Sequence, residues 1–255
     1  MTSACLPNLP RGMAKTVICG DHPAVLAALE QRGAEVLTVG TSTLLPVPVA
    51  DHADMLCCHA AENTVVTADG ALADELAARG VRCSVPRTLP GGSYPDDVAL
   101  NCLVVGGYAF GRKESTAPEL LEIFDRSGTR FVSVKQGYSR CSVAVVDDRS
   151  VITADLGLHK AMTAAGFDVL LISPGGIILE GYDTGFIGGC CGKLSRDRML
   201  FCGDPLRHPD GERIMEFLDR HGVKAERTHD GELVDFGGFI TIFCEQQPEN
   251  LVHTH

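Results

Sequence analysis

Residues 137–172 read GYSRCSVAVVDDRSVITADLGLHKAMTAAGFDVLLI, and this stretch contains one complete structural unit. Two apolar runs of strand length come first, and Asp155 directly follows the second run, where it can cap a helix. Leu158 and Met162 then lie four residues apart, on one face of that helix. Gly166 supplies the left-handed residue with which helices often end, before the apolar run DVLLI. The stretch therefore predicts the order strand, strand, helix, strand.

The same order recurs along the whole chain. Five predicted helices end at a glycine that is followed by an apolar run, at Gly33, Gly80, Gly128, Gly166 and Gly222. Asp21 and Asp69 precede two of these helices in the way that Asp155 precedes its own. Because one such unit cannot bury its apolar face alone, neighbouring units must complete the core. We therefore expect five packed units.

Each unit is also predicted to begin with an opening strand. Four of these strands are expected at residues 52–58, 95–105, 137–146 and 185–194. The N-terminal unit lacks one, because its first element, TVICG, already leads into a helix, whereas an extra strand, VDFGGFITIF, stands at residues 234–243. We expect this C-terminal strand to pair with the N-terminal unit and to close a ring.

The predicted fold is α/β: a five-bladed, pseudo-symmetric propeller of ββαβ repeats. With 45% apolar residues, the chain is able to bury a full core. We expect a single domain over residues 15–244, a flexible N-terminus at 1–14 and a flexible C-terminal tail at 245–255.

Composition and charge exclude several classes of function. The 33 acidic and 22 basic residues give a net charge of −11, and no basic run is present to neutralise phosphates, so nucleic-acid binding is not expected. The longest uncharged apolar stretches are about eight residues, far short of the roughly 20 needed to span a bilayer. A secretory signal has an apolar core after a basic start, and the N-terminal residues of this chain show no such core. We expect a cytoplasmic protein that does not bind membranes.

The eleven cysteines favour neither a disulfide framework nor a metal site. Their number is odd, and no Cys-x-x-Cys motif occurs. The neighbouring pairs Cys57-Cys58 and Cys190-Cys191 would point to opposite faces of a strand, which separates their thiols. We expect no metal and no cofactor, and the oligomeric state stays open.

Polar residues and glycines at the starts of the opening strands are predicted to converge on a central polar cavity. The candidates for ligand binding there are Asp54, Asp97, Lys135, Gln136, Tyr138, Gly188, Gly189 and Asp235. The alternative is that these residues only form the turns of a pseudo-symmetric scaffold.

The repeat resembles the pentein superfamily of guanidino-group-modifying enzymes, which includes arginine deiminase, amidinotransferases and dimethylarginine dimethylaminohydrolase. The run VKQGYSRCSVAVVDDRSVITAD, together with DVLLI and ILEGYDTGFIGGCCG, is similar to an uncharacterised bacterial family of this fold. The resemblance implies a cysteine nucleophile on the last opening strand, a histidine on an earlier one, and carboxylates that hold the guanidinium.

Only the acidic part of that chemistry has a counterpart in this sequence. Asp96 and Asp97 stand before an opening strand, as the resemblance requires. The expected position of the histidine falls at or near Gln136, and that of the cysteine falls at Ile240 or Thr241. The usual catalytic pair is therefore absent.

Three functions stay open. The first is the binding of a small polar or guanidino-like ligand without deiminase chemistry. The second is an amidinohydrolase or deiminase-type enzyme acting on C–N bonds, with Cys141 or Cys190 as a relocated nucleophile and Lys135, Arg140 or Lys193 as the cation that lowers its pKa. The third is a non-enzymatic interaction module, by analogy with the translation initiation factor of the same fold that keeps ribosomal subunits apart.

Overall fold

The computed structural model describes residues 2–246, and its elements repeat the predicted unit. In the unit first quoted, β10 (Val143–Val145) pairs antiparallel with β11 (Ser150–Thr153), which leads into α5 (Leu156–Ala164) and pairs parallel with β12 (Asp168–Leu171). Three further units follow the same order and pairing: β4 (Cys57–Ala61), β5 (Thr64–Thr67), α3 (Gly70–Ala78) and β6 (Arg82–Ser84); β7 (Leu103–Val105), β8 (Tyr108–Gly111), α4 (Pro118–Ser127) and β9 (Arg130–Ser133); and β14 (Cys191–Ser195), β15 (Arg198–Phe201), α6 (Gly211–Arg220) and β16 (Lys224–Arg227).

The remaining unit is built from both ends of the chain. β18 (Phe239–Glu245) pairs antiparallel with β2 (Ala14–Cys19), which leads into α1 (Pro23–Gln31) and pairs parallel with β3 (Glu35–Thr38). This is the pairing predicted for the C-terminal strand.

The N-terminal segment differs from the prediction. β1 (Thr2–Ala4) pairs with the other edge of β18, so part of the segment 1–14 is a strand held by backbone hydrogen bonds rather than a flexible end. At the other end, β18 extends to Glu245, and residues 247–255 of the predicted tail lie outside the described part of the chain.

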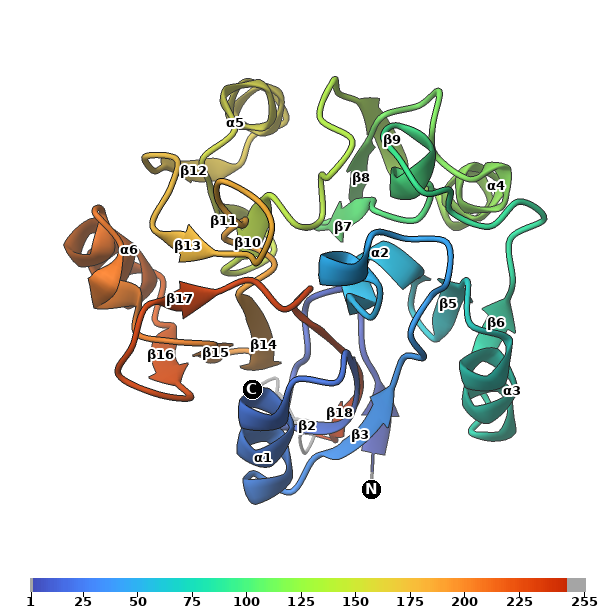
Figure 1. Cartoon of the computed structure of the whole chain (residues 1–255), viewed down its shortest axis with the longest axis horizontal. Coiled ribbons are helices and arrows are strands. Elements are labelled where there is room, and N and C mark those ends of the chain that lie inside the picture. Colours follow the sequence, from blue (N-terminus) through green and yellow to red (C-terminus); the bar gives the residue numbers. More distant parts are fainter. Residues whose placement is uncertain (1, 247–255) are drawn as a thin grey trace, which may run out of the picture.

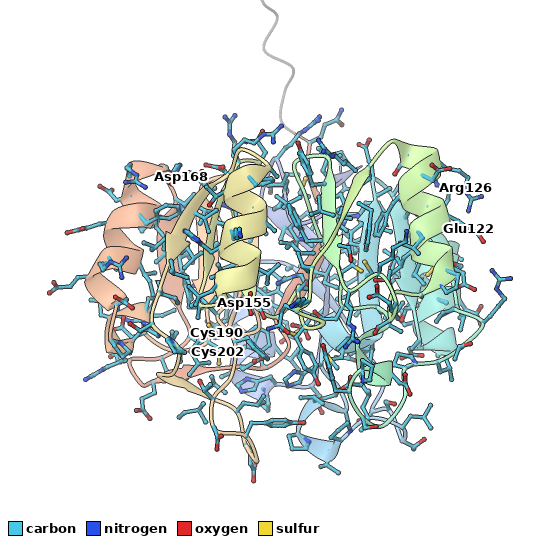
Figure 2. All side chains as sticks on the ribbon, turned by 90° about the horizontal axis from the view of Figure 1, so that it is seen from above. Glu122, Arg126, Asp155, Asp168, Cys190 and Cys202 are labelled. Carbon is cyan, nitrogen blue, oxygen red and sulfur yellow. The ribbon has the colours of Figure 1, made fainter. Side chains whose placement is uncertain are left out.

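Figure 1 shows α1, α3, α4, α5 and α6 on the outside of the molecule and the sheets arranged around its middle. The outward face of α4 is seen in Figure 2, where Glu122 and Arg126 point into solvent. Two short strands, β13 (Ile177–Ile178) and β17 (Leu233–Val234), pair in parallel and connect loops of different units. Within residues 2–246, no helix has the length and apolar character needed to cross a membrane.

Signals at the helix ends were mostly predicted correctly. All five helix-ending glycines have a positive φ, between 66° at Gly222 and 87° at Gly166. Asp69 caps α3 by accepting from two backbone N–H groups, and Asp155 caps α5 by accepting from the N–H of Leu158 at 2.7 Å. The prediction for Asp21 was wrong, because α1 starts at a proline and its N-cap is the next residue along, His22, whose side chain makes no capping bond.

The opening strands are shorter than predicted. The first part of each predicted strand forms turns or a short helix, and the strand begins where the residues become continuously apolar. The short helices of the chain are η1 (Val47–Val49), α2 (Ala53–Leu56), η2 (Asp96–Val98) and η3 (Pro205–Arg207). Polar side chains and glycines in these opening segments bond to neighbouring loops instead of to a sheet. The segments 52–56, 95–102, 137–142 and 185–190 are therefore loops that surround the middle of the molecule.

Apolar side chains pack between neighbouring units, as the repeat requires. One cluster joins Val17 of β2 and Leu29 of α1 to Leu200 of β15 and Phe239 of β18. A second cluster joins the unit of β7 to the unit of β10. Each interface between units is thus a separate core, which holds the opening loops in place.

Candidate functional site

Six polar residues meet where the opening loops of four units converge. His52 is the N-cap residue of α2 and Asp54 lies in its first turn. Arg140 and Cys141 belong to the turn before β10, and the other two residues stand before β7 and before β18. We call this set the central cluster: His52, Asp54, Asn101, Arg140, Cys141 and Asp235. None of the six is more than 7% exposed. Buried polar residues need partners, so their contacts determine what the cluster does.

Asn101 connects three of these loops. Its Nδ2 donates to the backbone carbonyl of Asp54 at 2.9 Å and lies 2.8 Å from the Sγ of Cys141. Its Oδ1 accepts from the backbone N–H groups of Arg140 at 2.8 Å and Cys141 at 3.3 Å. These bonds hold the thiol and the Asp54 backbone in a fixed relation.

The two carboxylates of the cluster differ in their partners. Asp235 accepts from the N–H groups of Phe186 at 2.8 Å and Gly237 at 3.1 Å, and its Oδ1 lies 3.8 Å from Nδ1 of His52. Asp54 is fully buried, and neither of its oxygens accepts a hydrogen bond from an N–H or O–H group in the described part of the chain, although the thiol of Cys141 lies close enough to lower its pKa. Burial raises the pKa of both groups, that of Asp54 to about 6. Asp54 is therefore a carboxylate whose nearest donor is a weak one, the thiol of Cys141.

Arg140 is the permanent cation of the cluster. Its Nη1 donates to the backbone carbonyl of Gly188 at 3.2 Å. Its charge lowers the pKa of Asp54 and Asp235, against the larger effect of burial, but within residues 2–246 it forms no ion pair with either one. When both carboxylates are ionised, they outnumber the guanidinium.

The two candidate nucleophiles are buried thiols. Burial raises the pKa of Cys141, and the nearby charges of Asp54 and Asp235 raise it further. Burial also raises the pKa of Cys190, whose Sγ donates to the carbonyl of Ile187 at 3.1 Å. Cys191 donates to the same carbonyl, so the two thiols point the same way and not, as predicted, to opposite faces of a strand. The reason is that Cys190 lies before β14 and does not belong to it. Figure 2 shows Cys190 beside Cys202, and the backbone N–H of Cys202 donates to the carbonyl of Cys190.

Labelling of the native protein with iodoacetamide is expected to modify Cys83 faster than Cys141 or Cys190. Cys83 is half-buried, whereas Cys141 and Cys190 are buried protonated thiols that become accessible only when the structure opens. Timed labelling followed by peptide mass spectrometry is expected to show a difference of roughly 100-fold or more, which disappears in urea. Modification of Cys141 as fast as Cys83 would contradict this and support a relocated nucleophile.

Other predicted ligand-binding residues lie around the cluster rather than in it. Tyr138 donates its hydroxyl to Asp97 at 2.6 Å, and burial raises the pKa of that carboxyl. Gln136 donates to Asp155 at 3.0 Å, and Asp155 lies at the lower end of α5 in Figure 2. Lys135 is exposed, because it follows the end of β9 on the surface.

Gly188 and Gly189 allow loops to approach each other closely. A side chain at Gly188 would overlap the backbone carbonyls of Arg140 and Cys141, and one at Gly189 would overlap the carboxylate of Asp235. The N–H of Gly189 donates to the carbonyl of Cys141 at 3.1 Å. Both positions are thus occupied by contacts within the protein, and these contacts explain why they are glycines.

The positions expected for the usual catalytic pair have other roles. Ile240 and Thr241 are buried in β18, and the hydroxyl of Thr241 donates to the carbonyl of Lys193 at 2.8 Å. Gln136 uses its amide oxygen to accept from the N–H of Tyr138.

A cavity of about 130 Å³ lies beside the cluster, and Gln136 is the predicted ligand residue that lines it. Asp54, Asp97 and Asp235 are not among its lining residues. The cavity therefore does not correspond to the central polar cavity predicted from the sequence.

Three members of the cluster were not predicted as ligand-binding residues. His52 and Asn101 are not among the residues predicted to bind a ligand, and Arg140 is predicted only as a cation that lowers the pKa of a thiol. The available signal for Asn101 was a polar residue directly before the apolar run CLVV. Spacing along the chain does not show which loops it connects, because its partners lie 39 to 47 residues away.

Residues 18–240 match a family of unknown function (DUF6873). No curated protein matches the sequence. Among solved structures, the inosamine-phosphate amidinotransferase StrB1 of Streptomyces griseus is similar, with a TM-score of 0.58 and 12% identity over 96% of this chain and 99% of that one.

Two further structures show the same likeness. The amidinotransferase SxtG of Microseira wollei, from the saxitoxin biosynthetic pathway, has a TM-score of 0.56 and 10% identity over 88% of this chain and 91% of that one. The dimethylarginine dimethylaminohydrolase of Pseudomonas aeruginosa has a TM-score of 0.55 and 11% identity over 91% of this chain and 99% of that one. These proteins are pentein superfamily members, which confirms the resemblance at the level of the fold.

Proposed function

This chain belongs to the family of unknown function DUF6873, and we propose that it binds a small cation of the guanidino or amidino class at its central cluster. The carboxylate of Asp54 carries this proposal, because it is fully buried and accepts no N–H or O–H hydrogen bond within residues 2–246. A buried carboxylate without donors is costly, and a ligand with several N–H groups and a positive charge removes that cost.

The charges of the cluster support a cationic ligand. Asp54 and Asp235 together carry two negative charges when ionised, against the single permanent charge of Arg140. Asp235 already accepts from two backbone N–H groups, so Asp54 is the carboxylate with free capacity to accept hydrogen bonds. A bound guanidinium would balance the charge and form charge-assisted hydrogen bonds with Asp54.

Access to Asp54 is proposed to run beside Arg140. Asp54 itself is 0% exposed, whereas Arg140 is 7% exposed and its guanidinium donates one hydrogen bond, at 3.2 Å. Movement of this long side chain is the simplest way to uncover the carboxylate. A ligand guanidinium then takes a place next to, or instead of, the guanidinium of Arg140.

Binding without deiminase chemistry is favoured over the relocated nucleophile. A thiolate is needed to attack a guanidinium carbon, and the pKa of both candidate thiols is raised by burial. The fold-level likeness to amidinotransferases and to a dimethylarginine hydrolase supports the ligand class. We further propose that the five units form a five-bladed propeller with pseudo-symmetry, whose opening loops surround this site.

Calorimetric titration with L-arginine, agmatine and citrulline tests the proposal. Citrulline is a matched control, because it replaces the guanidinium by a neutral ureido group of the same shape. The cations are expected to bind at least about tenfold more tightly than citrulline, since hydrogen bonds to a charged group contribute about 1.5–3 kcal/mol. Their affinity is expected to fall as the pH drops below about 6, where Asp54 becomes protonated.

Two variants of the cluster are expected to change the affinity in opposite directions. Asp54→Asn removes the charge that attracts the ligand and is expected to weaken cation binding by about 10- to 100-fold. Arg140→Ala removes the competing cation and opens the path, so it is expected to tighten binding. Asp74→Asn, on the exposed face of α3, is the control. Equal binding of citrulline, or unchanged binding by Asp54→Asn, would refute the proposal, and release of citrulline or urea from these compounds would refute its non-catalytic part.

A further inference from the structure

The cavity beside the central cluster has the features of a second ligand site. It lies between the unit of β10 and the loop segments 172–177, 184–187 and 208, and its volume is about 130 Å³. An engineered apolar cavity of about 150 Å³ binds a molecule as large as benzene, so this space is large enough for a small organic ligand.

Two buried polar atoms in the lining have no partner. His208 is 3% exposed, and its Nδ1 accepts from the backbone N–H of Asp210 at 3.0 Å, which leaves the proton of the neutral ring on Nε2. Nε2 forms no well-aligned hydrogen bond in the described part of the chain, although the backbone carbonyls of Ser173 and Gly175 lie near enough to the ring to favour its protonated form. The hydroxyl of Ser142, whose residue is 2% exposed, is also unpartnered. Together they offer one N–H donor and one hydroxyl to whatever fills the cavity.

The rest of the lining favours an uncharged ligand. Six of the lining residues are apolar: Ala154, Ile172, Pro174, Ile177, Phe186 and Ile187. No lysine or arginine is among the lining residues, so an anion would lack a counter-charge. Each oxygen of Asp155 already accepts one hydrogen bond, from the N–H of Leu158 or from the amide of Gln136, so a cation would have to share this carboxylate with both donors.

The cavity is separate from the central cluster. The backbone at Phe186 stands between them, because its N–H donates to Asp235 while the residue also lines the cavity. Ser142 likewise follows Cys141 but belongs to the cavity lining. The two sites are therefore adjacent: the same backbone segments border both, but no side chain belongs to both.

We propose that this cavity binds a small uncharged amide. The amide carbonyl accepts from Nε2–H of His208, an amide N–H donates to Oγ of Ser142, and a branched apolar substituent packs against Phe186 and Ile177. The Nε2–H of His208 requires an acceptor, and the hydroxyl of Ser142 can pair with a donor or an acceptor; an amide provides both on one neutral, planar group.

The test compares three probes of the same size and branching: isobutyramide, isobutyrate and isobutylammonium. Binding is measured by calorimetry and by the NMR signals of the His208 imidazole in the full-length protein. Isobutyramide is expected to bind at least about tenfold more tightly than either ion, and to shift the Nε2–H resonance of His208. Asp54→Asn is expected to leave this binding unchanged, which separates the outcome from that of the proposed guanidino site.

Two variants assign the contacts. His208→Phe removes the donor and is expected to weaken binding about tenfold or more, whereas His208→Gln keeps an N–H donor and is expected to restore part of it. Ser142→Ala is expected to weaken binding several-fold, and Ser150→Ala, a buried serine outside the cavity, serves as the control. The proposal would be overturned if all three probes bound equally, or if Ser142→Ala bound isobutyramide as tightly as the wild-type protein. It would also be overturned if a crystal soaked with isobutyramide showed only water in the cavity.

Discussion

A chain that ends at Gly238 is expected to remain unfolded. It lacks β18, which lies between β1 and β2 in the four-stranded sheet and joins the two ends of the chain. Phe239, Ile240 and Ile242 of this strand are buried in two different cores. Losing a buried phenylalanine costs about 3–5 kcal/mol and a buried isoleucine about 2–5 kcal/mol, so the sum reaches the whole stability of a typical domain, about 5–15 kcal/mol.

A chain that ends at Gln246 is the matched control, because it keeps β18 complete. Near-ultraviolet circular dichroism and amide NMR dispersion are expected to be native for this control and lost for the chain that ends at Gly238. A cooperative thermal transition in the shorter chain would contradict the prediction. It would show that four units fold without the closing strand.

The second large effect concerns stability and pH at Asp54. Asp54→Asn is expected to raise the free energy of unfolding by about 3 kcal/mol at pH 8, which corresponds to a pKa shift of about two units. The pKa of Asp54 is raised from 3.8 to about 6 in the folded protein because burial disfavours the charged form. Above pH 6 the folded state therefore holds an unfavourable charge, whereas below pH 4 the carboxyl is neutral in both states.

The expected pH profile follows from this sign. As the pH falls from 6 to 4, the wild-type protein gains stability from Asp54, and the advantage of Asp54→Asn disappears. His52, Asp235, Arg140 and Cys141 face the same carboxyl and shift the midpoint without changing the sign. Urea unfolding at several pH values measures the effect, with Asp74→Asn as the exposed control. A variant less stable than wild type at pH 8 would show that Asp54 is held by favourable contacts.

Together, stability and binding separate two roles of Asp54. A structural carboxylate, when replaced, lowers stability and leaves ligand affinity alone. The buried, unpartnered carboxylate seen here is expected to do the opposite, because its cost is offset only when a cation is bound. Loss of affinity with a gain in stability is therefore the specific signature of the proposed site.

The fold was largely predictable because its signals are local. Gly166, Asp155 and the four-residue spacing of Leu158 and Met162 mark a helix within a few residues of one another. The pairing of β18 with β2 is not local, but the missing opening strand in the N-terminal unit identified it. Asp21 was assigned wrongly because the helix starts two residues later, at Pro23, and no pattern of spacing distinguishes the two positions.

The candidate site was only partly predictable. Asp54 and Asp235 were named from their place at the openings of strands, and both lie in the central cluster. Lys135 was named for the same reason, yet it is exposed, because chain position does not show which way a side chain points. Gly188 and Gly189 were expected to contact a ligand and instead touch Arg140, Cys141 and Asp235, since a glycine fits any close approach.

The sequence by itself determined the repeated unit, the residues that end its helices and the strand that joins the chain ends, because hydrophobic spacing and helix-terminal residues act over a few positions. Only the tertiary structure decided that Cys141 is buried beside two carboxylates, that Asn101 connects three loops, and that Asp54 accepts no N–H or O–H hydrogen bond within residues 2–246. These facts depend on contacts between residues about 40 to 180 positions apart. Such contacts form only when the cores between units bring the opening loops together.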